Sequence, residues 1–306
     1  MEFLYLLEKI RFSGLNEFML TITTLGEETA FLVIALIVFW CIDKYRGYYV
    51  LGVGLMGTLA SQFMKILCKI PRPWVKDENF TILEQAREAA DGYSFPSGHT
   101  QSAVGTFGAV AASGKKKAVA ITCIVLAALV GFSRMYVGVH TPADVLVGAG
   151  LSVALIVVLR PLMLGKKRRI SAVYWVMLAL SVGFMLFMEL YPNPETLDSH
   201  NYESAIKNAY TLLGCSAGVL VVYYFDEKKL HFKNHAIWWA QVLKVVLGLL
   251  VVLAVKEGMR GPLEALFGGH MAARAVRYFL VVLSAGTLWP LTFGWFSKIG
   301  RKQEQQ

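Results

Sequence analysis

The 306-residue sequence has few charged side chains for its size. Charged residues make up 17% of the chain and hydrophobic residues 56%, whereas soluble domains contain about 25% charged residues. The chain lacks the charge to cover a water-facing globule, and its hydrophobic content excludes a disordered or fibrous protein. The composition therefore predicts an all-α, polytopic membrane protein, a bundle of helices that cross the bilayer.

Cysteine is also scarce, and no CxxC pair occurs. The four cysteines are Cys41, Cys68, Cys123 and Cys215. They lie in apolar stretches, which indicates neither a disulfide framework nor a zinc site. A signal peptide is not expected, because Glu2 and Glu8 interrupt a short apolar run. We expect residues 1–27 to hold an amphipathic helix at the membrane interface.

Nine stretches are apolar enough to be candidate membrane spans, since about 20 residues of helix cross the hydrocarbon core. They cover residues 28–42, 48–68, 98–113, 118–136, 143–164, 170–190, 205–225, 236–255 and 278–297. After the N-terminal segment, we divide the chain into a core bundle over residues 28–165 and additional C-terminal helices over residues 166–306.

Basic residues outnumber acidic ones by 30 to 21, which gives a formal net charge of +9. In a membrane protein this excess favours positively charged cytoplasmic loops over nucleic-acid binding. Alternate loops carry compact clusters that hold fifteen of the basic residues. These are Lys44 and Arg46, Lys115 to Lys117, Lys166 to Arg169, Lys228 with Lys229 and Lys233, and Lys298 with Arg301 and Lys302. We expect these loops and the C-terminus to face the cytoplasm, in the plasma membrane, and the N-terminus to face the other side.

Three polar clusters lie at span ends on the expected non-cytoplasmic side. They contain Lys65 and Arg72, then Ser97, Gly98 and His99, then Arg134, His140 and Asp144. The clusters close or open four consecutive spans, so the topology alone brings them together. Taken singly, each residue has a structural explanation as a helix cap, an interfacial polar group or a snorkelling cation. Those explanations do not account for their joint position at one end of the bundle.

The local chemistry of these clusters suits a phosphate group. Ser97 and Gly98 begin a helix, whose unpaired N–H groups and positive dipole end attract an anion. Arg72 and Arg134 can each fork two N–H groups onto phosphate oxygens, and Lys65 adds a compact charge. If the second span continues through Arg72, the seven-residue spacing places Lys65 and Arg72 on one helix face. Such a cradle needs no metal ion.

Two histidines with separate roles complete the predicted site. Thr141 resembles an N-cap, so Asp144 falls in the first helical turn and can orient His140. A carboxylate there fixes the tautomer of the imidazole and leaves its other nitrogen free to attack phosphorus. His99 is then placed to protonate the leaving oxygen.

The pattern K-x6-R-P, P-S-G-H and S-R-x5-H-x3-D resembles the three-part signature of the type 2 phosphatidic acid phosphatase superfamily, which also contains vanadium haloperoxidases. The resemblance covers roughly residues 45–160. It implies phosphate binding by Lys65, Arg72, Ser97, Gly98 and Arg134. It also implies that His140 is the nucleophile, Asp144 its assistant and His99 the proton donor. The nine-span layout is similar to the glucose-6-phosphatase and sphingosine-phosphate phosphatase branch.

The sequence thus predicts an integral membrane lipid phosphate phosphatase that uses a phosphohistidine, without metal or cofactor. The alternatives are a polyprenyl diphosphate phosphatase, a lipid phosphotransferase or a non-catalytic lipid transporter. We expect a lipid phosphate substrate and membrane lipids as partners, and no nucleic acid; the oligomeric state is left open. Lys244 lies some eight residues into the eighth span without an evident partner, and ionisable groups at such depth are usually paired or functional.

Overall fold

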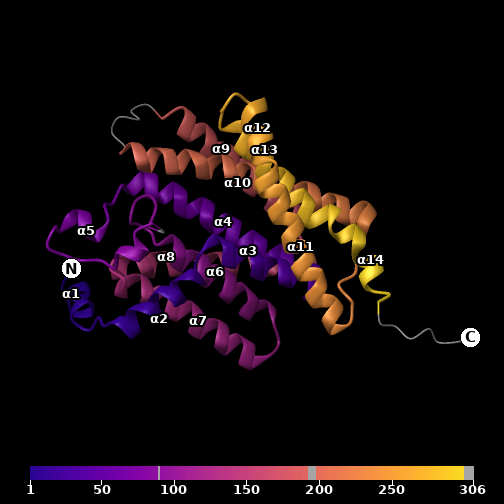
Figure 1. The fold of residues 1–306 in the computed structure, drawn as a ribbon. Helices are drawn as coiled ribbons and strands as arrows, with labels where there is room; N and C mark the ends of the chain where they lie inside the picture. Colours follow the sequence, from indigo (N-terminus) through magenta and orange to yellow (C-terminus); the bar gives the residue numbers. More distant parts are fainter. Residues whose placement is uncertain (89, 192–197, 300–306) are drawn as a thin grey trace, which may run out of the picture.

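The computed structural model describes residues 1–88, 90–191 and 198–299. Regular secondary structure in these ranges is helical, which confirms the all-α prediction (Figure 1). The α-helices are α1 (Glu2–Lys9), α2 (Ser13–Thr24), α3 (Glu28–Ile37), α4 (Lys44–Cys68), α5 (Pro73–Lys76), α6 (Gly98–Ser113), α7 (Lys117–Tyr136), α8 (Pro142–Leu164), α9 (Ile170–Glu189), α10 (Ser199–Phe225), α11 (Trp238–Gly258), α12 (Arg260–Leu266), α13 (Ala272–Leu283) and α14 (Phe293–Phe296). Shorter 3-10 and π-helical turns are η1 (Val38–Ile42), η2 (Glu84–Ala86), η4 (Asp226–Leu230), η5 (Ser284–Leu288) and η6 (Pro290–Thr292). Arg301 and Lys302, from the last predicted basic cluster, lie outside the described residues.

The predicted apolar stretches correspond to helices. In the described part of the chain, seven helices are long and apolar enough to cross a membrane, and the bent pair α2 and α3, with an angle of 54°, raises the number to eight. The remaining predicted stretch is α6, which has sixteen residues and packs against α4, α7 and α8. Neighbouring helices cover α6, so it can lie within the bundle without being long enough for a full crossing. The predicted total of nine spans is therefore approximate.

Two groups of helices meet along α3 and α4. Figure 1 shows α6, α7 and α8 on one side of these two helices and α9 to α13 on the other. Within the first group α6 packs against both α7 and α8, and within the second α10 packs against both α9 and α13. Close approach in the first group depends on Gly148 of α8, because a Cβ there would lie 2.7 Å from the carbonyl oxygen of Ser97.

A buried ion pair joins the two groups at the expected cytoplasmic end. Lys44 Nζ, at the start of α4, lies 2.9 Å from Oδ2 of Asp226, which is fully buried in η4. The neighbouring hydroxyl of Tyr45 donates to Glu227 Oε1 over 2.9 Å. Lys44 was expected as one of the charges of a cytoplasmic loop, and in the structure it also fixes the C-terminal helices onto α4.

The N-terminal segment folds back onto the end of the bundle that carries the polar clusters. It forms two helices, α1 and α2, where we expected one. Leu4 and Leu7 of α1 are buried in a cluster with Phe80 and Ile82, and α2 packs along α7. The interfacial position of residues 1–27 stays a prediction.

Candidate active site

Arg72 is held by the loop that precedes α6. The helix α4 ends at Cys68, so Arg72 lies beyond it and not on a continued helix face as the seven-residue spacing suggested. Its Nε donates to the carbonyl oxygen of Gly92 over 3.1 Å and its Nη2 to that of Asp91 over 2.7 Å. Nη1 donates to the Val139 carbonyl over 3.2 Å. These bonds fix a guanidinium that is only 6% exposed.

Lys65 reaches the same place from the last turn of α4. Its ammonium group is 5% exposed and donates to the carbonyl oxygen of Tyr93, in the loop that also binds Arg72. Electrostatic interactions connect Lys65 with Arg72, Arg134 and Asp144. The three cations predicted to bind phosphate therefore converge, although they come from three separate segments.

The start of α6 borders this cluster. Ser97 is its N-cap: its fully buried Oγ accepts from the hydroxyl of Thr100 over 2.9 Å. The backbone N–H of Ser97 donates to the carbonyl oxygen of Asp144 over 2.9 Å, which ties α6 to the first turn of α8. A Cβ added at Gly98 would meet no atom within 4 Å among the described residues. The helix N-terminus thus borders open space, as an anion site at this position requires.

His140 and Asp144 are joined through a third residue, Ser94. The predicted capping box is present, because the Thr141 N–H donates to Asp144 Oδ2 over 2.8 Å. His140 Nδ1 lies 3.5 Å from the same Oδ2. The Ser94 hydroxyl donates to that oxygen over 2.6 Å and lies 3.5 Å from His140 Nδ1. The carboxylate is thereby fixed on the Nδ1 side of the imidazole.

The other ring nitrogen of His140 faces Arg72, with Nη1 2.9 Å from Nε2. Since a guanidinium can only donate, Nε2 is the acceptor, and the proton of a neutral ring resides on Nδ1 beside Asp144. Burial lowers the pKa of His140 well below its usual value, and the charges of Arg72, Arg134 and Lys65 lower this pKa further. The site therefore favours a neutral imidazole with its lone pair on Nε2.

Two polar groups keep unused hydrogen-bonding capacity inside the site. Arg134 is fully buried and its Nη1 donates to Thr23 Oγ1 over 2.6 Å, but Nε and Nη2 have no partner within the described chain. The same holds for Nε2 of His99, which interacts electrostatically with Arg134 and His140. Buried donors without partners are costly, and a phosphate group here would satisfy them.

Sequence reasoning missed three residues of this arrangement, Ser94, Thr23 and Asp91. Ser94 lies in a loop without periodicity, and only its place three residues before Ser97 associates it with the motif. Thr23 approaches Arg134 from 111 positions earlier in the chain, which no spacing rule reveals. Asp91 binds Arg72 through its backbone carbonyl, on which the residue type carries no information.

Fold and site together are those of a helical membrane protein with buried cations and histidines gathered at one end of its helices. Comparisons with known proteins agree with this class. Residues 46–169 match the PAP2 superfamily model, and residues 210–302 match the model of the PAP2 superfamily phosphatase transmembrane extension. No solved structure matches the chain significantly.

Two relatives, both from Bacillus subtilis (strain 168), carry phosphatase names. One is named phosphatidylglycerophosphatase B and is 33% identical over 155 residues, which cover 48% of this chain and 74% of the relative. The other is named undecaprenyl-diphosphatase BcrC and is 32% identical over 104 residues, 34% of this chain and 50% of that relative. The chain belongs to the PAP2 superfamily. This confirms the resemblance inferred from the motifs and the prediction of a phosphoric monoester hydrolase of the lipid phosphatase kind.

Proposed function

We propose that this protein removes the terminal phosphate of a lipid phosphate by way of a phosphohistidine at His140, without a metal ion. One observation carries the proposal: both ring nitrogens of His140 have defined partners. Nδ1 faces Asp144 and Ser94, and Nε2 faces Arg72. A neutral imidazole oriented in this way can present Nε2 to phosphorus while Asp144 stabilises the cation that develops.

The reaction then has two steps. Nε2 of neutral His140 attacks phosphorus, the ester P–O bond breaks, and His99, which enters the step as the imidazolium, gives a proton to the leaving lipid oxygen. In the second step His99 takes a proton from water, the water oxygen attacks phosphorus, and the P–N bond breaks. Phosphate leaves and His140 returns to its neutral form. Protons and bonds balance over the cycle, with water as the only co-reactant.

Positive charge for this chemistry comes from the protein itself. Lys65, Arg72 and Arg134 all interact electrostatically with His99 in the first turn of α6, and together they can stabilise the equatorial oxygens of the transferring group. Among the described residues, no cluster of three or more His, Cys, Asp or Glu side chains is arranged to hold a metal ion. Turnover is expected to persist in excess EDTA. Loss of turnover on chelation, with recovery on adding a divalent ion, would contradict the mechanism.

The proposed substrate is a phosphate ester with an apolar tail, because the site lies at the ends of helices long and apolar enough to cross a membrane. Phosphatidylglycerophosphate is the first candidate in view of the relative named phosphatidylglycerophosphatase B. Phosphatidate, lysophosphatidate and sphingoid-base phosphates present the same monoester. A polyprenyl diphosphate is the second candidate, favoured by the relative named undecaprenyl-diphosphatase.

The proposal is tested with purified protein in detergent, supplied with these lipids one at a time and scored by released inorganic phosphate. Wild-type protein should release phosphate without an added acceptor, which separates a phosphatase from a phosphotransferase or a transporter. His140→Ala should abolish turnover. His99→Ala should still form an acid-labile phosphoenzyme from a substrate with a good leaving group, since such a group needs little protonation. Full activity in His140→Ala would overturn the proposal.

A further inference from the structure

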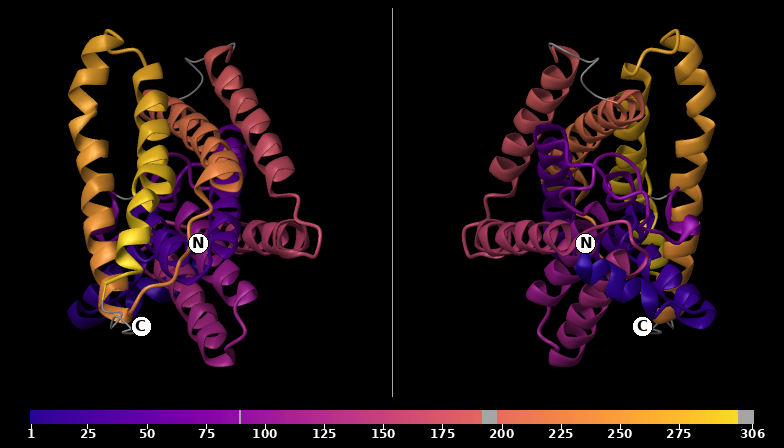
Figure 2. Two further views of the ribbon diagram at one scale, coloured as in Figure 1. Left: turned by 90° about the vertical axis from the view of Figure 1, so that its right-hand side faces the viewer. Right: turned by 90° about the vertical axis from the view of Figure 1, so that its left-hand side faces the viewer.

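A cavity of about 280 Å³ lies between the core bundle and the C-terminal helices. Its walls come from α3 and α4 in the core and from α10, α11 and α13, which stand together in Figures 1 and 2. Along α10 the lining extends from Asn208 to Val222, fourteen positions and about 21 Å of helix. One leaflet of the hydrocarbon core is about 15 Å thick, so the cavity is deep enough for the chain of one lipid.

The two ends of the cavity differ in polarity. Glu28, Asn208 and Lys256 line the end at which α3 and α10 begin and α11 finishes, on the same side as the catalytic residues. The opposite end is lined mainly by apolar side chains, among them Phe39 and Val222, and by Tyr48, whose hydroxyl donates to Asp226 Oδ2 over 3.4 Å. A lipid has the same division between a polar head region and an apolar chain.

Helix α4 connects this cavity to the phosphate site along one face. Leu51, Leu55 and Thr58 line the cavity, and Lys65 follows Thr58 by seven positions, which is nearly two full turns. Between them lies Ser61, which is 1% exposed and whose Oγ has no hydrogen-bond partner in the described part of the chain. The face of α4 that carries Lys65 therefore continues into the cavity through a polar side chain that no described residue satisfies.

Helix α10 makes the same connection from the other side. Ser204, in its second turn, donates to Asp91 Oδ2 over 2.6 Å. The carbonyl oxygen of Asp91 in turn accepts from Arg72 of the phosphate site. One turn further along α10, Asn208 lines the cavity.

At the start of α3, two adjacent residues belong to the phosphate site and to the cavity. Glu27 interacts electrostatically with Arg134 of the phosphate site, whereas Glu28 lines the cavity. The helices α3, α4 and α10 thus each connect the cavity with the phosphate site.

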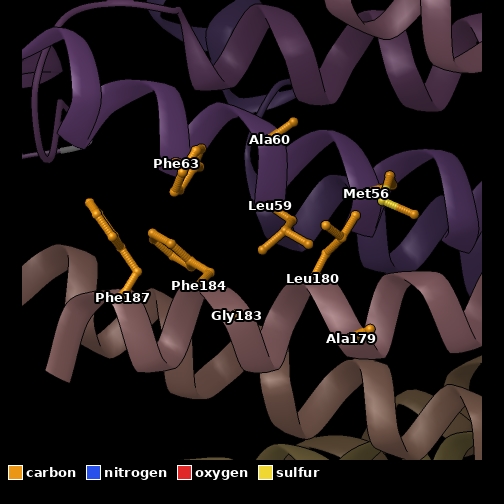
Figure 3. Close-up of a pocket in the computed structure, with 9 residues that line it drawn as sticks. All are labelled: Met56, Leu59, Ala60, Phe63, Ala179, Leu180, Gly183, Phe184 and Phe187. Atoms are coloured by element: carbon orange, nitrogen blue, oxygen red, sulfur yellow. The ribbon is translucent and has the colours of Figure 1, made fainter. Parts of the chain in front are cut away.

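A second apolar space does not share this continuity. A groove of about 540 Å³ lies between α4 and α9, lined among others by Phe63, Gly183 and Phe187 (Figure 3). Phe63 and Lys65 are two positions apart, about 200° around the helix. The groove therefore faces away from the catalytic cluster.

From these observations we infer that one hydrocarbon chain of the substrate lipid occupies the cavity bounded by α3, α4, α10, α11 and α13 while Lys65, Arg72 and Arg134 hold its phosphate. The volume of about 280 Å³ lies just below the ~300–1,000 Å³ typical of ligand sites, which suits a single chain. The transmembrane extension then contributes directly to substrate binding. This inference rests on the proposed phosphatase function and adds the chain-binding site to it.

The test compares two substrates with the same phosphate headgroup, one with a long chain and one too short to reach Val252. Val252 is 2% exposed on α11 and lines the cavity. Val252→Phe should lower kcat/KM for the long-chain substrate about ten-fold or more, and leave the short-chain value within about two-fold of wild type. The matched control is Gly183→Leu, which fills the α4–α9 groove and should leave both values unchanged. The inference is overturned if Val252→Phe keeps the wild-type kcat/KM for both substrates. It is also overturned if only Gly183→Leu lowers kcat/KM for the long-chain substrate.

A wild-type protein that hydrolyses neither substrate would refute the proposed function itself, which is a different outcome. If Val252→Phe loses activity on both substrates, crosslinking of wild-type protein decides. A lipid phosphate with a photoreactive diazirine at the chain end should label peptides of α3, α10 or α11 that line the cavity. Labelling of Leu180, Phe184 or Phe187 instead would overturn the inference.

Discussion

Nη1 of Arg72 lies 2.9 Å from Nε2 of His140. In this arrangement the guanidinium occupies the lone pair that must attack phosphorus. A bound phosphate offers Arg72 oxygen acceptors of full negative charge, which form stronger hydrogen bonds than a neutral imidazole. We therefore expect substrate binding to draw Arg72 onto the phosphate and to free Nε2 for attack.

The first prediction concerns pH. Burial and the neighbouring cations lower the pKa of His140, so the ring stays neutral, and nucleophilic, as the pH falls through the ordinary histidine value of about 6.5. On the acid side of the profile, activity that depends on neutral His140 should be lost only when the pH drops through this lowered pKa. The profile of kcat/KM against pH should therefore show no acid limb from the enzyme at or above pH ~6.5.

The phosphate of the substrate has its own ionisation near pH ~6. Its pKa is therefore measured separately by phosphorus NMR, and the effect of this ionisation on kcat/KM is subtracted from the profile. A residual acid limb centred at or above the ordinary histidine value would contradict the prediction.

The second prediction concerns Ser94, which bridges Asp144 and His140. Ser94→Ala removes the 2.6 Å bond to Oδ2, while the Thr141 N–H still holds the carboxylate. Loss of one hydrogen bond to a charged group, worth about 1.5 kcal/mol, should lower kcat about ten-fold with little change in KM.

The control is Ser113→Ala. The Ser113 hydroxyl bonds only to the carbonyl of Val110 among the described residues, at the far end of α6. An unchanged kcat in Ser94→Ala would show that Ser94 does not position the catalytic pair.

The third prediction concerns Lys244, for which the sequence offered no partner. Its ammonium group is 1% exposed and donates to the carbonyl oxygens of Trp40 over 2.8 Å and Asn234 over 3.1 Å. It also lies 4.3 Å from the ring centre of Phe293. Lys244→Met removes the donor to the Trp40 carbonyl, whereas the Asn234 carbonyl still accepts from Gln241 Nε2 over 2.7 Å. The change should destabilise the protein by about 1–3 kcal/mol, with kcat/KM unchanged.

Thermal unfolding in detergent measures this effect, with the exposed Lys229→Met as control. A fall in kcat/KM at an unchanged unfolding temperature would instead assign Lys244 a role in the reaction.

The fourth prediction concerns the side of the membrane that the site faces. In a background lacking the four native cysteines, Asn79→Cys near the site should react with an impermeant thiol reagent on intact cells. Lys116→Cys, in a basic loop, should not. Both positions are exposed, so accessibility in the folded chain is matched. The reverse pattern would place catalysis in the cytoplasm.

Much of the fold could be predicted because a membrane span imposes a simple rule on the sequence. Each crossing needs about 20 apolar residues in one helix, so runs such as 118–136 and 143–164 gave α7 and α8 nearly at their observed bounds. The capping box of Thr141 and Asp144 could also be predicted, because both partners lie within one helical turn. The α6 helix was harder to class as a span, because protein rather than lipid surrounds it.

The sequence by itself determined the helices, the family and the set of residues gathered at one end of the bundle, since these depend on local spacing and on alternating topology. Only the tertiary structure decided what those residues touch. Arg72 does not lie on the helix face that its spacing suggested, and its Nη1 contacts Nε2 of His140. Arg134 donates to Thr23, and Lys244 donates to the carbonyl oxygen of Trp40, 204 positions away in the chain. The physical reason is that a buried polar group takes whichever partner packing brings within hydrogen-bonding distance, and packing joins segments that are remote in the chain.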